Sequence, residues 1–181
     1  LNWLPAVEVR GEGLFFSLDD SRIADWSKQK AVIERADKID QADANEWRRL
    51  APDKERPYVI TAKFILLHSL AHAVMRSISL ECGYDTASIR ERIYCDEGSS
   101  INNGILLYTS SSDAEGTLGG LSRMSEPDKF LPLIGHAVAK AEWCSSDPLC
   151  IKDVMSESFA ANLAACHNCM LVPETSCEIR N

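Results

Sequence analysis

The chain has 181 residues, of which 45% are hydrophobic, and it carries a formal net charge of −8 at neutral pH. This length fits a single domain with room for an N-terminal appendage, and this composition is sufficient for a hydrophobic core. The acidic balance argues against a domain that binds phosphate backbones non-specifically by itself. Any DNA contact must therefore be local or come through a partner.

The N-terminal third is predicted to contain short strands followed by polar helices. The stretch LPAVEVRGEGLFFSL, residues 4–18, has the pattern of two short strands with glycines between them. Residues 20–38 have helical periodicity, and residues 41–50 are predicted to form a short polar helix. Residues 51–57, APDKERP, have the composition of a loop.

The strongest helix prediction in the chain covers residues 58–80. This segment is apolar on most faces and stops before Gly83, a residue that suits a helix C-terminus, so we place it at the centre of the domain. Its lysine and histidines argue against a membrane span. Downstream, the pattern predicts a helix-to-strand junction at 86–94, a buried strand at 104–110 and a second helix at 127–143.

Seven cysteines are present, and the spacing of four of them is typical of a metal site. Cys144 and Cys150 are separated by five residues, and Cys166 and Cys169 by two. Two such pairs can present four thiolates, and Zn²⁺ accepts four sulfur ligands in a tetrahedron that is structural rather than catalytic. No signal peptide is visible, so we expect a cytoplasmic protein whose reduced thiols bind metal rather than form disulfides.

Other interpretations of the cysteines remain open at this point. Buried free thiols are common in protein cores, and we expect Cys82 and Cys95 to be of this kind. Cys177 can replace one of the four predicted ligands, although its surroundings favour the first turn of a helix facing the core. A thioredoxin-type redox motif is disfavoured because no βαβ pattern precedes the Cys-x-x-Cys pair.

His68 and His72 are four residues apart in HSLAH, which places both imidazoles on one face of the central helix. Zinc metallopeptidases use this spacing, but Ser69 stands where they carry the glutamate that acts as general base. Asp113 and Glu115 could supply carboxylates, and together with the histidines they form our alternative prediction, a metal-dependent hydrolase or nuclease. The favoured interpretation is that the histidines hydrogen-bond to neighbouring loops within the core.

The glycine-rich segment SSSDAEGTLGGL, residues 110–121, follows a predicted strand, and such an arrangement can bind phosphate on backbone amides. It lacks the Gly-Lys-Ser/Thr of a nucleotide-hydrolysing loop, and a tight turn is the favoured interpretation. Arg90 and Arg92 in SIRERIY are our candidates for contact with nucleic acid. Taken alone, the residues favour the other interpretation, in which the two arginines pair with surface carboxylates.

Several stretches closely resemble one known family, and together they cover nearly the whole chain. VEVRGEGLFF, LLHSLAHAVMRSISLECGYDTASIRERIY, GILLYTSSSDAEGTLGGL, WCSSDPLC and AACHNCMLVPETSCE resemble the C-terminal part of DrmB-like proteins of the DISARM anti-phage system and the zinc-binding domain of MrfA-type DNA-repair helicases. The resemblance implies a non-enzymatic module that holds zinc through Cys144, Cys150, Cys166 and Cys169 and leaves Cys177 out. It also implies a helicase subunit of the defence complex as partner, with DNA engaged through that complex.

These observations predict an α+β fold with a long buried central helix, a small mixed sheet and a zinc-stabilised C-terminal lobe. Residues 1–56 are expected to form an N-terminal hairpin and helical segment, and residues 57–181 the helicase-associated zinc-binding domain. The predicted function is to scaffold a DNA helicase partner, with Arg90 and Arg92 as possible DNA contacts. We expect no membrane association.

Overall fold

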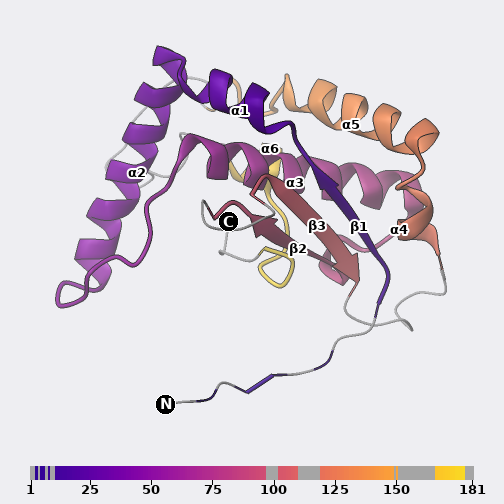
Figure 1. The fold of residues 1–181 in the computed structure, drawn as a ribbon, viewed down its shortest axis with the longest axis horizontal. Coiled ribbons are helices and arrows are strands. Elements are labelled where there is room, and N and C mark those ends of the chain that lie inside the picture. The colour runs from indigo at the N-terminus through magenta and orange to yellow at the C-terminus, as the bar shows by residue number, and fades with distance from the viewer. Residues whose placement is uncertain are drawn as a thin grey trace.

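The computed structural model describes residues 3, 5, 6, 8, 11–96, 102–109, 119–148, 150 and 166–177. Helices and three short strands make up this part of the chain (Figure 1). The elements in chain order are β1 (Gly13–Ser17), α1 (Asp20–Ser27), α2 (Lys30–Leu50), α3 (Ala62–Cys82), the 3-10 turn η1 (Thr86–Ser88), β2 (Ile89–Tyr94), β3 (Gly104–Thr109), α4 (Gly120–Arg123), α5 (Pro127–Ala141) and α6 (His167–Met170).

The three described strands form one sheet in the order β1-β3-β2. The most apolar strand, β3, lies in the middle, where both of its edges are paired and its side chains are best protected. Leu107 of β3 faces Leu14 of β1 on one side and Glu91 of β2 on the other. Both pairings are antiparallel. The predicted α+β class is therefore confirmed, but the sheet is antiparallel rather than mixed.

The central helix α3 packs lengthwise against one face of this sheet, and α5 runs alongside it (Figure 1). Thr61 caps the start of α3 by accepting a hydrogen bond from the backbone N–H of Phe64 at 3.2 Å. Gly83 ends it at φ 75°, a left-handed conformation that favours glycine. Leu67, Val74 and other fully buried side chains of α3 meet the inward side chains of the strands in a single core. The prediction of a buried central helix is confirmed.

The segment between β1 and α3 differs from its predicted form. The single helix expected over 20–38 is wrong at residues 28–29, where the chain turns and Gln29 adopts the extended conformation of an N-cap. The second helix, α2, then continues through the polar segment 41–50. Ala36, Ile39 and Ala42 give it a narrow buried face at helical spacing, which explains how so polar a helix stays packed.

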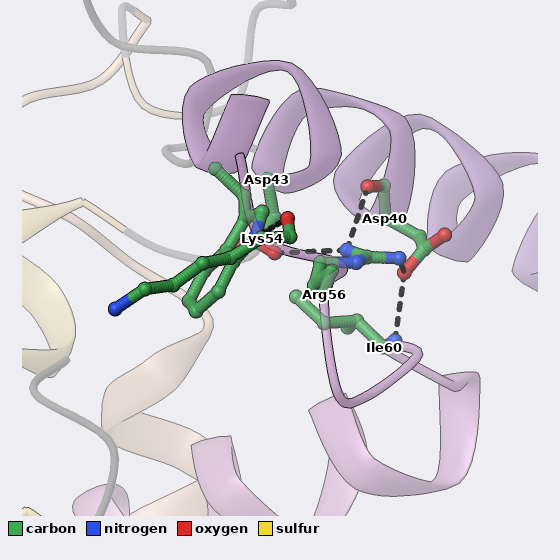
Figure 2. A network of polar contacts seen from close by, with 6 residues as sticks. Asp40, Asp43, Lys54, Arg56 and Ile60 are labelled. Atoms are coloured by element: carbon green, nitrogen blue, oxygen red, sulfur yellow. Dashed lines mark hydrogen bonds and ion pairs between the residues drawn. The ribbon is translucent and has the colours of Figure 1, made fainter. Parts of the chain in front are cut away.

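Arg56 ties the loop after α2 back onto that helix (Figure 2). Its guanidinium donates to the Asp43 carboxylate at 2.8 Å and to the backbone carbonyl of Asp40 at 3.1 Å, and it also pairs with the Asp40 carboxylate. That carboxylate accepts a further bond from the backbone N–H of Ile60 at 2.7 Å. The network therefore sets where the chain leaves α2 and enters α3.

Residues 1–56 and 57–181 share secondary structure, because β1 pairs with β3. The division of the chain at this boundary stays a prediction. Within the described residues, no helix is both long enough and apolar enough to cross a membrane.

Candidate metal centre

The four cysteines predicted as ligands lie together beyond the end of α5. The Cys144 and Cys166 sulfurs are 3.4 Å apart, and those of Cys150 and Cys169 are 3.8 Å apart. All four sulfurs lie within 4.8 Å of one another. Zinc–sulfur bonds of about 2.3 Å in a tetrahedron separate neighbouring sulfurs by about 3.8 Å, so the described cluster has the dimensions of a four-thiolate zinc site.

Local backbone geometry turns these thiols toward one another. Cys166 is the N-cap of α6, and Cys169 lies in the turn that follows, so one turn of chain presents both sulfurs. The Cys169 sulfur accepts a bond from the backbone N–H of Cys166 at 3.3 Å, and the Cys144 sulfur accepts one from Ser146 at 3.4 Å. N–H donors aimed at sulfur stabilise thiolate, which is the form that binds metal.

The thiols of the cluster differ in acidity. Burial alone would raise the pKa of Cys166, but hydrogen bonds from backbone N–H groups, with that of Cys169 first, bring it below its ordinary value. Burial and the neighbouring Cys166 sulfur hold the pKa of Cys150 above its ordinary value. A divalent cation bound between the sulfurs would favour the deprotonated form of all four.

A second group of side chains that could bind a metal ion lies in the core, on the face of the sheet that packs against α3. The Nε2 atom of His68 is 3.1 Å from the Glu91 carboxylate and 3.2 Å from the Cys177 sulfur. The Nε2 atom of His72 is 3.5 Å from the same Glu91 oxygen. One ligand atom from each of these four residues lies within 4.8 Å of the other three. Helix α3, strand β2 and the C-terminal segment 171–177 thus meet at one point in the core.

Opposite charges stabilise each other in this group. Burial disfavours the charged forms, but the Cys177 sulfur and the Glu91 carboxylate outweigh it and raise the pKa of both histidines to about 9. Burial likewise opposes ionisation of Glu91, yet hydrogen bonds from His68 and His72 lower its pKa to about 2. With protons alone, the group is a buried imidazolium–carboxylate network.

The residues that surround His68 and His72 differ in part from those that the sequence analysis considered. Hydrogen bonding within the core is found, since His72 Nδ1 bonds the carbonyl oxygen of Met170 at 2.7 Å. The carboxylates proposed for a hydrolase, Asp113 and Glu115, lie outside the described residues. The group near the histidines instead includes Glu91 and Cys177, which our sequence analysis did not associate with them.

A sequence signal for Glu91 existed. In IRERIY the residues alternate, so Glu91 shares the phase of Ile89 and Ile93 and must face the core. A carboxylate in an inward phase requires a cationic or metal partner. Cys177 carried no comparable signal beyond its expected position facing the core, where it is in fact buried.

Arg90 and Arg92 lie on the opposite face of the sheet and are exposed. Arg90 pairs in register with Tyr108 of β3. Phe15 of β1 is 46% exposed on the same face and contacts Tyr94 edge to face, with ring centroids 5.9 Å apart. The predicted nucleic-acid contacts therefore belong to a face that combines arginines with aromatic rings. Cys82 and Cys95 are half-buried and pack against the core.

The fold and the thiol cluster together define a class, a small α+β domain that carries a four-cysteine metal-binding motif at its periphery. The family model described as the MrfA Zn-binding domain matches residues 70–170, and the chain belongs to that family. The chain is also similar to the DISARM protein DrmB of Bacillus paralicheniformis (strain ATCC 9945a / NCIMB 11709 / CD-2), with 39% identity over 183 aligned residues. The match covers 99% of this chain but 31% of that relative.

Proposed function

We propose that this chain is a zinc-stabilised, non-catalytic module of an anti-phage defence protein, and that it scaffolds a DNA helicase partner. The observation that carries the proposal is the convergence of Cys144, Cys150, Cys166 and Cys169 within 4.8 Å in a chain of the MrfA Zn-binding domain family. Similarity to a DISARM protein supports the defence role. The helicase partner rests on the family resemblance of the sequence.

The zinc in this proposal has a structural role. Four thiolates fill a tetrahedral zinc, which leaves no coordination position for water or substrate. Closing the metal site joins the loop after α5 to α6, a region with few large buried side chains of its own among the described residues. Metal binding then replaces hydrophobic burial as the source of local stability.

Contact with DNA would use the outer face of the sheet. Arg90 and Arg92 supply positive charge there, while Phe15, Tyr94 and Tyr108 supply rings on which unpaired bases can stack. The net charge of −8 opposes binding by the isolated chain, so this face is proposed to act when the partner holds the DNA nearby.

The scaffold role is tested by co-purification. The chain is expressed with the helicase subunit of its defence complex, and the tagged chain is expected to retain that subunit through size exclusion. Cys166→Ser combined with Cys169→Ser should release it, whereas Cys82→Ser should retain it. If wild-type chain and helicase elute separately at micromolar concentrations, the scaffold proposal is wrong.

The DNA contact is tested by fluorescence anisotropy of a single-stranded oligonucleotide with the assembled complex. Arg90→Ala with Arg92→Ala should weaken binding at least about tenfold, since each phosphate or stacking contact is worth roughly 1 kcal/mol or more. The matched control is Arg35→Ala with Arg48→Ala, which removes the same charge from exposed positions on α2. Equal weakening in both double variants would indicate a general charge effect and contradict a specific contact.

A further inference from the structure

We propose that His68, His72, Glu91 and Cys177 form a second metal site, separate from the four-thiol cluster, which holds one Zn²⁺ in a closed and structural coordination shell. The four residues offer two imidazole nitrogens, one carboxylate oxygen and one sulfur within 4.8 Å of one another. The family match covers residues 70–170, so His68 and Cys177 both lie outside it.

The distances within the group fit a tetrahedral ion. Zinc bonds of about 2.0–2.3 Å to nitrogen, oxygen and sulfur place neighbouring ligand atoms about 3.3–3.8 Å apart. The observed separations from His68 Nε2 are 3.1 Å to Glu91 and 3.2 Å to Cys177, and that from His72 Nε2 to Glu91 is 3.5 Å. These three separations are within a few tenths of an ångström of the tetrahedral values, and every other pair of ligand atoms lies within 4.8 Å.

The orientation of His72 leaves its Nε2 atom available to a metal ion. The carbonyl oxygen of Met170 can only accept, so Nδ1 of His72 carries the proton in the 2.7 Å bond between them. When this imidazole is neutral, its lone pair is on Nε2, which faces the Glu91 carboxylate at 3.5 Å. Nε2 is fully buried, and among the described residues its contact with Glu91 is long for a hydrogen bond. Two electron-pair donors that face each other at this distance need a positive charge between them, which either a proton on Nε2 or a bound metal ion supplies.

A metal satisfies this requirement better than extra protons do. The rings of His68 and His72 are edge to face, with centroids 4.4 Å apart. Protonating both would place two cations beside one carboxylate whose side chain has no solvent exposure. One Zn²⁺ takes both imidazoles in their neutral form and neutralises Glu91 together with a Cys177 thiolate. The bond from His72 to a backbone carbonyl is also the usual outer contact of a metal-binding histidine.

A metal ion at this site would crosslink three segments of the chain. It would join α3, β2 and the C-terminal segment, which already runs beside the outer edge of β2. The backbone N–H of Glu91 donates to the carbonyl oxygen of Ser176 at 3.1 Å, and the Ser176 hydroxyl donates to the carbonyl oxygen of Thr86 at 2.7 Å. With three of four ligands buried, the site has the closed character of a structural metal.

Metal stoichiometry tests the proposal. Elemental analysis of the purified protein is expected to give about two zinc ions per chain, one for each cluster. Cys177→Ala should reduce this to about one, and Cys166→Ala with Cys169→Ala should also leave about one. Cys82→Ser is the matched control, because Cys82 is a half-buried cysteine outside both clusters, and it should keep both ions.

Cobalt identifies which site remains. Co²⁺ bound by four thiolates gives intense sulfur-to-metal charge-transfer absorption, and a site with one thiolate gives a much weaker band. The Cys177→Ala protein should keep the intense band, and the Cys166→Ala/Cys169→Ala protein only the weak one. Cys177→His replaces one ligand with another and should restore the second ion.

The proposal survives a variant that fails to fold, because the wild-type protein decides it alone. One zinc per chain in the wild type, together with saturation by one equivalent of Co²⁺, would overturn the second site. So would two ions retained by a folded Cys177→Ala protein. Either result would leave the four residues as a hydrogen-bonded network and would not affect the proposed role of the thiol cluster.

Discussion

The Nδ1 atom of His72 donates a hydrogen bond to the carbonyl oxygen of Met170 at 2.7 Å, and this bond joins the central helix to the α6 turn that carries Cys166 and Cys169. Arg76 reinforces the connection one turn later by donating to the carbonyl oxygen of Leu171 at 3.2 Å. The thiol cluster is therefore attached directly to the core helix, and an ion that fixes α6 also fixes the carbonyl that orients His72.

Removal of metal is expected to destabilise the C-terminal segment more than it destabilises the sheet. Chelation should raise amide hydrogen exchange across residues 166–177 and at Glu91, whose N–H depends on Ser176 in that segment. The pairing of β1 with β3 rests on apolar contacts with α3 and should stay protected. Peptide-resolved exchange with and without chelator measures both regions. Equal loss of protection in both would show that metal controls global folding instead.

Cys144→Ser is expected to weaken zinc binding by more than about 100-fold, the upper end of effects from outer-shell partners, because it removes a ligand itself. Cys144 is buried and its sulfur lies 3.4 Å from that of Cys166. Competition with a chromophoric chelator gives the affinity. Acidification should release zinc from the wild type as protons compete for the thiolates. Unchanged affinity in Cys144→Ser would remove this residue from the ligand set.

The central helix and the thiol cluster were predictable from sequence because both signals are local. An apolar run ending at Gly83 specifies a buried helix and its end, and the two-residue spacing of Cys166 and Cys169 specifies a shared ion. The helix break at residues 28–29 has no proline or glycine to mark it. The break lets α2 change direction so that its narrow apolar face packs against the rest of the fold. The direction of α2 is determined by this packing and not by the local sequence.

The His68 cluster could not be assembled from sequence, because its members come together only through tertiary contacts. The ion pair to Glu91 spans 23 positions of chain, and the contact to Cys177 spans 109. Alternation in β2 gives the phase of Glu91 but not the element that it faces. The antiparallel sheet likewise depends on how the strands are connected in space rather than on the pattern of any one strand.

Arg56→Ala is expected to lower the free energy of unfolding by about 1–3 kcal/mol, since it leaves two carboxylates without their shared guanidinium. The Arg56 side chain is only 13% exposed, and it contacts both Asp40 and Asp43 (Figure 2). Urea denaturation measures the change. Arg49→Ala is the control, because its pair with Glu46 is exposed and screened by water, so its loss should change the stability much less. Equal effects of the two substitutions would contradict a role for Arg56 in anchoring α2.

Tyr84→Phe is expected to destabilise the fold by about 1–3 kcal/mol, because the Tyr84 hydroxyl links the loop after α3 to α4 and to the residue before β1. It accepts from the backbone N–H of Leu121 at 3.0 Å and donates to Glu12 at 2.5 Å. Gly120 lies against the same hydroxyl, and a Cβ at position 120 would stand 2.7 Å from its oxygen. Gly120→Ala should therefore displace the hydroxyl and break the same bonds.

The two substitutions act on one interaction, so their effects should not add. The double variant Tyr84→Phe with Gly120→Ala is expected to be less destabilised than the sum of the single variants, by roughly 0.5–3 kcal/mol. Urea denaturation of the wild type, the two single variants and the double variant gives the four free energies of unfolding that this double-mutant cycle needs. Simple additivity would mean that Gly120 is required for the backbone path into α4 rather than for the approach of Tyr84.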